Sequence, residues 1–185
     1  MARKLPVAIE VEEFGLLCKK AKPKFRVAFL LGFASGLRLS EIVGGYRKDG
    51  TTIPALTKEM VKLDERKITI IGGKGDVDRT APLPKGFGET HLKLLPLNQG
   101  YKNIASARRA MQKAFKSAAK GAGLLKKKPT LHFHSLRHGF GTQLANKGTP
   151  VHIIRDLMGH SSISTTNVYL RSTSKEALEA YEKYF

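Results

Sequence analysis

Hydrophobic residues recur every three or four positions over much of the chain, which is the spacing of helices that bury one face. This spacing predicts helices over residues 10–20, 25–34, 104–120 and 134–146. A shorter helix is expected to begin near Leu39, just after Arg38. Residues 126–129 carry three lysines and a proline, and we expect a loop there.

Capping signals predict more helices toward the C-terminus. Thr149 and Pro150 suit the cap and the first residue of a helix that Gly159 ends. Ser164 is expected to cap the next helix. Thr173 is expected to begin the last one, because a glutamate three residues later completes a capping box.

Between the second and third of these long helical segments, the pattern changes to glycines, prolines and β-branched residues. Residues 67–71 and 78–83 flank a glycine-rich segment at 72–77, which predicts an antiparallel hairpin with the glycines at its tip. Pro82 has no backbone N–H, so its strand should lie at a sheet edge. The sequence therefore predicts a mainly α-helical fold with a small antiparallel β-sheet, an α+β class, in a single domain over residues 1–185.

Charge narrows the choice of partner. The chain carries 33 Lys and Arg against 15 Asp and Glu, a formal net charge of +18. Such an excess on a folded domain indicates a polyanionic partner, nucleic acid first of all. The lone Cys18 excludes an internally disulfide-bonded scaffold, and the longest apolar stretch, residues 27–37, is too short to span a bilayer. We expect a DNA-associated protein of the cytoplasm that does not enter membranes.

Candidate chemistry lies on the helix predicted at 134–146. His134, Arg137 and His138 are spaced to project from one helical face. A helical zinc-protease motif would need glutamate at Ser135, and the sequence has no cysteine pair or dense acidic cluster to supply other metal ligands. We therefore expect neither a metal ion nor another cofactor.

Three strings of the sequence combine these residues with others: SGLRLSEI at 35–42, HSLRHGF at 134–140 and LMGHSSISTTNVY at 157–169. In this order and spacing they resemble the tyrosine recombinases of the phage integrase family. The resemblance extends from about residue 7 to the end of the chain, and it implies the catalytic-domain fold of that family.

The resemblance also implies roles for individual residues. Tyr169 would attack a DNA phosphodiester, form a 3′-phosphotyrosyl link and free a 5′ hydroxyl. Arg38 and Arg137 would bind the nonbridging phosphate oxygens, because guanidinium groups pair with phosphate bidentately and stay charged. His134 and His160 would donate further hydrogen bonds, and His134 is also the candidate to accept the tyrosine proton.

A lysine on the hairpin tip completes the set. Lys74 would protonate the departing 5′ oxygen, with Arg79 as the alternative. Glu41 is expected to orient an arginine or histidine, and His138 to support the site. Because the phosphotyrosyl ester keeps the bond energy, rejoining would need neither metal nor ATP.

Assembly and two other functions complete the expectations. The resemblance starts almost at the first residue, so the N-terminal DNA-clamping domain of the family is expected to be absent. Residues 175–185 match a C-terminal helix that packs into a neighbouring protomer in this family, which implies a homotetramer on double-stranded DNA and a monomer in isolation. The alternative is a helix folded back on its own domain. A type IB topoisomerase shares the same nicking and closing chemistry. A non-catalytic DNA-binding protein is the other alternative, because residues 143–170 have helix–turn–helix length with Gly148 at the turn.

Overall fold

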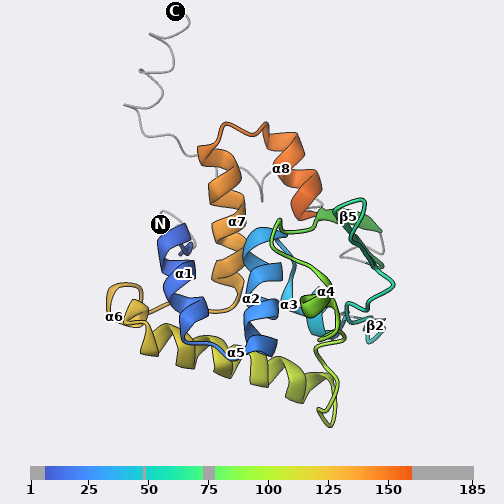
Figure 1. The fold of residues 1–185 in the computed structure, drawn as a ribbon, viewed down its shortest axis with the longest axis horizontal. Coiled ribbons are helices and arrows are strands. Elements are labelled where there is room, and N and C mark those ends of the chain that lie inside the picture. Colours follow the sequence, from blue (N-terminus) through green and yellow to red (C-terminus); the bar gives the residue numbers. More distant parts are fainter. Residues whose placement is uncertain (1–6, 48, 73–77, 160–185) are drawn as a thin grey trace, which may run out of the picture.

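The computed structural model describes residues 7–47, 49–72 and 78–159 (Figure 1). The helices are α1 (Val11–Lys19), α2 (Pro23–Ala34), α3 (Leu39–Val43), α4 (Glu89–Leu92), α5 (Ile104–Gly121), α6 (Leu124–Lys127), α7 (His134–Asn146) and α8 (Val151–Met158). The strands are β1 (Gly45–Tyr46), β2 (Thr52–Ile53), β3 (Val61–Lys62), β4 (Lys67–Ile70) and β5 (Arg79–Pro82). Helix outweighs strand, which confirms the predicted mainly α fold with antiparallel β structure.

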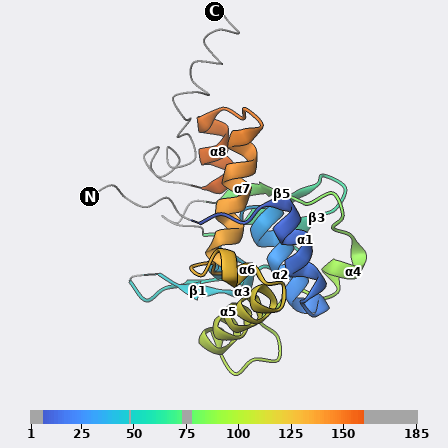
Figure 2. The ribbon, with the colours of Figure 1, turned by 90° about the vertical axis from the view of Figure 1, so that its left-hand side faces the viewer.

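The helices pack around one main hydrophobic core, and α5 lies across the ends of α1 and α2 (Figures 1 and 2). Phe29 of α2 packs edge-on against Phe115 of α5, with ring centroids 5.6 Å apart, and near Phe133, at 5.9 Å. A smaller hydrophobic cluster that includes Phe140 and Met158 joins α7 to α8. Because α8 also contacts β5, its C-terminal end lies where the helical body meets the sheet.

The β structure consists of two small antiparallel sheets, where the sequence predicted one. β1 pairs with β2, and β3, β4 and β5 form the second sheet in that order. In the β4–β5 hairpin Lys67 lies opposite Pro82, and Ile70 opposite Arg79. The hairpin is confirmed, and β5 with its proline lies at the sheet edge as predicted. β1, β2 and β3 are two residues long, too short to leave a periodic pattern in the sequence.

Two side chains hold the base of the β4–β5 hairpin at Gly72. Nη2 of Arg47 donates a hydrogen bond to the Gly72 carbonyl oxygen (2.9 Å). The Gly72 N–H donates to Oδ1 of Asp78 (2.8 Å), across the mouth of the hairpin. The predicted tip, with Lys74, lies outside the described residues.

The helix boundaries confirm most of the predicted elements and correct two of them. α7 covers the predicted residues, and Gly159 ends α8 in the left-handed conformation. Pro150, in an extended conformation with ψ 141°, takes the cap position of α8, so the prediction of Thr149 as the cap was wrong. The expected loop at 126–129 is partly helical, because α6 is anchored by the buried Leu124. The helices predicted after Ser164 and Thr173 lie outside the described residues.

Candidate active site

Three arginines from separate elements converge on the C-terminal end of α8. Each guanidinium donates a hydrogen bond to one of three successive backbone carbonyls. The pairs are Arg79 Nη1 with Leu157 O (2.6 Å), Arg137 Nη2 with Met158 O, and Arg38 Nη2 with Gly159 O (2.8 Å). The last carbonyls of a helix have no partner within the helix and carry partial negative charge, so cationic donors stabilise them.

A buried carboxylate joins two of these arginines. Oε1 of Glu41 accepts from Nη1 of Arg38 (2.9 Å), and Oε2 accepts from Nη2 of Arg79 (2.9 Å) and from the Arg38 backbone N–H (2.7 Å). Burial alone raises the pKa of Glu41, but the charges of Arg79, then Arg38, outweigh it and hold that pKa below its usual value. Glu41 therefore stays ionised and holds both the backbone N–H and the guanidinium of Arg38.

Arg137 is buried at the start of α7, with 2% of its surface exposed. Besides Met158, its guanidinium reaches the chain just before Arg38, where Nη1 donates to the Gly36 carbonyl oxygen (2.5 Å). Gly36 adopts φ +66°, and a Cβ there would lie 2.5 Å from the Phe140 ring. The glycine therefore lets the backbone pass Phe140 and present its carbonyl to Arg137.

Two histidines of α7 lie beside the arginines. The rings of His134 and His138 meet edge to face, with centroids 4.7 Å apart. Desolvation, together with the charges of His138 and Arg137, lowers the pKa of His134 to about 3. Desolvation, with His132 and Arg137, lowers the pKa of His138 to about 4. Both rings are therefore neutral at pH 7, and each keeps one nitrogen that can accept a proton.

A basic cavity of about 400 Å³ opens beside Arg38 and His134. Its other lining residues come from α3, α5 and the start of α7: Leu39, Ser40, Arg108, Gln112, Lys116, His132 and Phe133. No acidic side chain is among these residues. The spacing of Arg108, Gln112 and Lys116, four residues apart on one helical face, was the signal in the sequence that would have identified this side of the cavity.

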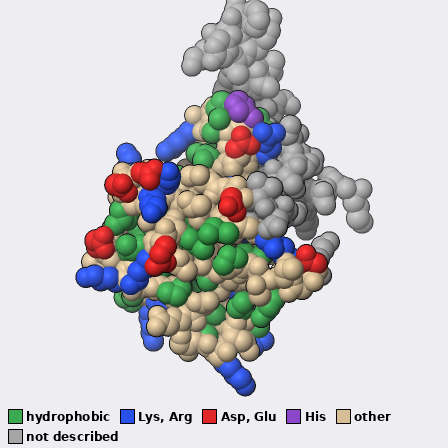
Figure 3. All heavy atoms as spheres, turned by 90° about the vertical axis from the view of Figure 1, so that its right-hand side faces the viewer, with side chains coloured by type: hydrophobic (Ala, Val, Ile, Leu, Met, Phe, Trp, Pro, Cys, Tyr) green, Lys and Arg blue, Asp and Glu red, His purple; other side chains and the backbone are tan. Residues whose placement is uncertain are grey.

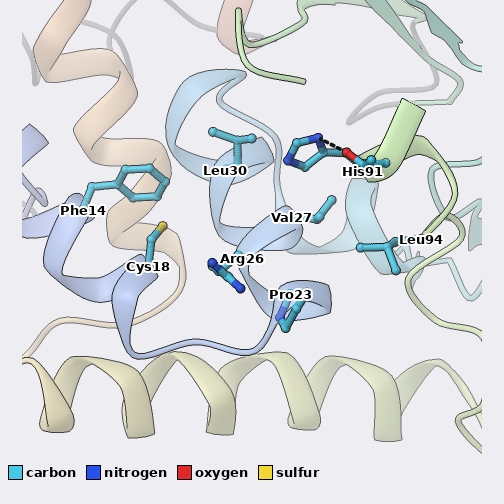
Figure 4. Close-up of a pocket in the computed structure, with 9 residues that line it drawn as sticks. Phe14, Cys18, Pro23, Arg26, Val27, Leu30, His91 and Leu94 are labelled. Atoms are coloured by element: carbon cyan, nitrogen blue, oxygen red, sulfur yellow. Dashed lines mark hydrogen bonds between the residues drawn. The ribbon is translucent and has the colours of Figure 1, made fainter. Parts of the chain in front are cut away.

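A second cavity of about 400 Å³ lies between α1, α2 and the α4 region (Figure 4). Phe14 and Cys18 line it from α1, Leu30 from α2, and His91 and Leu94 from the opposite side. Burial raises the pKa of the Cys18 thiol to about 11, so the thiol is protonated and a poor nucleophile. None of these side chains belongs to the arginine cluster.

The structure brings five of the predicted site residues into one cluster: Arg38, Glu41, His134, Arg137 and His138. Lys74, His160 and Tyr169 lie outside the described residues. Sequence reasoning treated Arg79 as an alternative proton donor and missed its contacts with Glu41 and α8. No spacing rule links a strand arginine to partners 38 and 78 positions away.

The described part of the chain contains no group of three or more His, Cys, Asp or Glu side chains placed to hold a metal ion. Within the same part, no helix combines the length and apolar character needed to cross a membrane.

Residues 9–176 match the sequence profile of the phage integrase family. The match covers most of the chain, and its range includes Arg38, Arg137, the histidines of α7 and Tyr169. This chain belongs to the phage integrase family. The family resemblance inferred from the three sequence strings is thereby confirmed.

A relative with a known name gives the scale of the sequence similarity. The chain is 31% identical to the tyrosine recombinase XerA of Pyrococcus furiosus over 193 residues, which cover 97% of this chain and 62% of XerA. The chain thus spans about three-fifths of the length of that relative.

Similarity to solved structures establishes the fold. The XerH site-specific recombinase bound to its difH substrate superposes with a TM-score of 0.71 at 21% identity, covering all of this chain and 56% of XerH. The catalytic domain of bacteriophage HP1 integrase gives 0.60 at 20% identity and covers 95% of this chain and 94% of that domain. Nearly the whole HP1 catalytic domain is therefore matched by this chain.

Proposed function

We propose that this chain is the catalytic part of a site-specific DNA recombinase that cuts and rejoins strands through a 3′-phosphotyrosyl intermediate at Tyr169. The observation that carries the proposal is the convergence of Arg38 and Arg137 on the carbonyls of Met158 and Gly159. These bonds span 121 positions for Arg38 and 21 for Arg137, so distant parts of the chain are linked directly before His160. Membership of the family supports Tyr169 as the nucleophile.

Arg38 and Arg137 supply the charge that a phosphodiester reaction needs. Negative charge builds on the nonbridging phosphate oxygens in the transition state, and fixed cations there lower the barrier without reorganising. Within the described residues, the side chain of Arg38 uses two of its five N–H groups for Glu41 and Gly159. The remaining N–H groups of Arg38 are available to phosphate.

The neutral state of His134 fits a proton acceptor. In the proposed reaction the Tyr169 oxygen attacks phosphorus, the P–O5′ bond breaks, and the phenolic proton passes to His134. A pKa of about 3 would make a weak base, but the phosphate and the forming phenolate bring negative charge that raises it toward the ordinary value. Lys74 would give its proton to the departing 5′ oxygen, so charge and protons balance.

Double-stranded DNA is the substrate class that the basic cavity favours. Arg108 and Lys116 line the cavity next to Arg38, and we expect them to contact phosphates that flank the scissile one. On the face shown in Figure 3, by contrast, acidic side chains lie among the basic ones. We expect the DNA backbone to follow the side lined by α5.

The test is a cleavage assay on negatively supercoiled plasmid in EDTA, stopped with detergent. We expect relaxed topoisomers and protein covalently bound to DNA. Both products should disappear in Tyr169→Phe, because the phenyl ring has no hydroxyl to attack phosphorus. Tyr46→Phe is the matched control, since Tyr46 is exposed on β1, and it should keep both products.

The outcomes separate the alternatives. DNA binding with no covalent product from the wild-type chain would contradict the proposal and favour a non-catalytic DNA-binding protein. Relaxation without transfer of a labelled strand between two duplexes would favour a topoisomerase. A covalent product that persists in Tyr169→Phe would show that another residue is the nucleophile.

A further inference from the structure

Arg79 combines burial with a set of partners that no other described residue shares. Its side chain is 9% exposed, on edge strand β5 opposite Ile70. One terminal nitrogen donates to Glu41 and the other to the Leu157 carbonyl oxygen. Through these two bonds Arg79 joins the sheet, α3 and the end of α8.

The contacts around Arg79 match a guanidinium in shape. A planar fork can donate to a carboxylate and a carbonyl at once, whereas a lysine ammonium is a compact point charge. Gly159 packs against the same side chain so closely that a Cβ there would lie 2.4 Å from Cδ of Arg79. Gly159 is also the residue whose carbonyl oxygen accepts from Arg38. The Arg79 side chain therefore packs against the backbone that Arg38 binds.

Resting on the recombinase function above, we propose that Arg79 is a positioning residue that sets the orientation of Arg38 through Glu41 and the last turn of α8. It touches no reacting atom in this scheme. Glu41 holds Arg38 from one side and Gly159 holds it from the other, and Arg79 contacts both supports. Losing Arg79 would therefore weaken the orientation of Arg38, although Arg38 itself would remain present and charged.

The experiment measures the rate of covalent adduct formation and, separately, the affinity for duplex DNA. Arg79→Gln should slow adduct formation by about 10²-fold, the cost of a misplaced catalytic group, with affinity changed less than about threefold. Arg79→Lys should recover little of the rate, because one ammonium cannot replace the fork. The matched control is Arg66→Gln, since Arg66 also donates to backbone carbonyls, those of Phe87, Leu83 and Pro84, but does not contact Glu41.

A pH profile adds a readout that a merely structural role would not change. Glu41 faces Arg38 from its own turn, Arg79 from β5 and Arg137 from α7, and Arg79 lowers its pKa most. In Arg79→Gln the Glu41 pKa should rise, so adduct formation should fall more steeply than in the wild type as the pH drops from 7 to 5. In a Glu41→Gln background, Arg79→Gln should add less than about threefold.

Each of the following results would overturn the inference. Wild-type rate and pH profile in Arg79→Gln would show that Arg38 needs no such support. Equal losses in Arg79→Gln and Arg66→Gln, or unfolding of both Arg79 variants by circular dichroism, would reduce Arg79 to a stabilising residue. A wild-type chain without Tyr169-dependent adduct would overturn the recombinase function first, and this inference with it.

Discussion

At the residue scale, the arginines at the end of α8 are neutralised only in part. Arg38 and Arg79 share the Glu41 carboxylate, and all three guanidiniums also donate to uncharged backbone carbonyls. A carbonyl orients a guanidinium without cancelling its charge, so the cluster keeps positive charge for an anion. With one carboxylate per arginine the charges would cancel, and the cluster would lose its attraction for phosphate.

The paired histidines give a prediction on stability against pH. The pKa values of His134 and His138, about 3 and about 4, lie below the ordinary value near 6.5, so the unfolded chain binds these protons more readily. Stability should therefore fall as the pH drops from about 6.5 toward 4. Urea unfolding of His134→Gln and His138→Gln should show a smaller fall than the wild type. His152→Gln, a change of an exposed α8 residue, serves as the control and should keep the wild-type fall.

Negative charge near the histidines should reverse their shift. We expect the pKa of His134, followed by NMR, to rise when a short DNA duplex binds, because phosphate favours the charged ring. A pKa that stays near 3 in the complex would contradict the role of His134 as proton acceptor.

At the element scale, α8 is the platform of the site. It is short, and its C-terminal turn accepts hydrogen bonds from three arginines, which lie on β5, on α7 and in the loop before α3. The turn ends at Gly159, whose φ of +58° lies in the left-handed region that favours glycine. Gly159 therefore ends α8, packs against Arg79 of β5, and comes directly before His160 in the sequence.

Replacing Gly159 tests how much depends on that turn. Gly159→Ala should lower the free energy of unfolding in urea by about 3 kcal/mol, from left-handed strain together with displacement of Arg79. Gly148→Ala is the matched control, because Gly148 has φ +72° and open space around its Cα, and it should cost about 1 kcal/mol. Equal losses in the two variants would show that the contact with Arg79 adds nothing.

Elements with strong local signals could be predicted from the sequence, and contacts between distant elements could not. The apolar spacing of α7 and the glycines around the β4–β5 hairpin are local, so both elements were located correctly. The bond between Arg38 and Glu41 is also local, three residues apart, and for Glu41 the sequence predicted a role in orienting an arginine or histidine. The bond from Arg79 to Leu157 depends on where β5 meets α8, which no local pattern encodes.

At the scale of the whole molecule, the net charge of +18 suits a polyanion, but its use depends on where the charges lie. Arg38 and His134 link the catalytic cluster to the basic cavity, and α5 extends that cavity with Arg108 and Lys116. The face in Figure 3 mixes both signs of charge. A duplex bound along α5 would therefore meet Arg108 and Lys116 beside the catalytic arginine Arg38.

The salt dependence of DNA binding tests this path, because each phosphate contact releases counterions. Anisotropy titrations on a random-sequence duplex should give a falling line of log affinity against log salt. Arg108→Ala and Lys116→Ala should each make that slope shallower by about 1, whereas Lys19→Ala, an exposed α1 residue outside the cavity, should leave it unchanged. Unchanged slopes in the two α5 variants would move the DNA path away from α5. If all three variants changed the slope alike, the net charge of the molecule, rather than this surface, would hold the duplex.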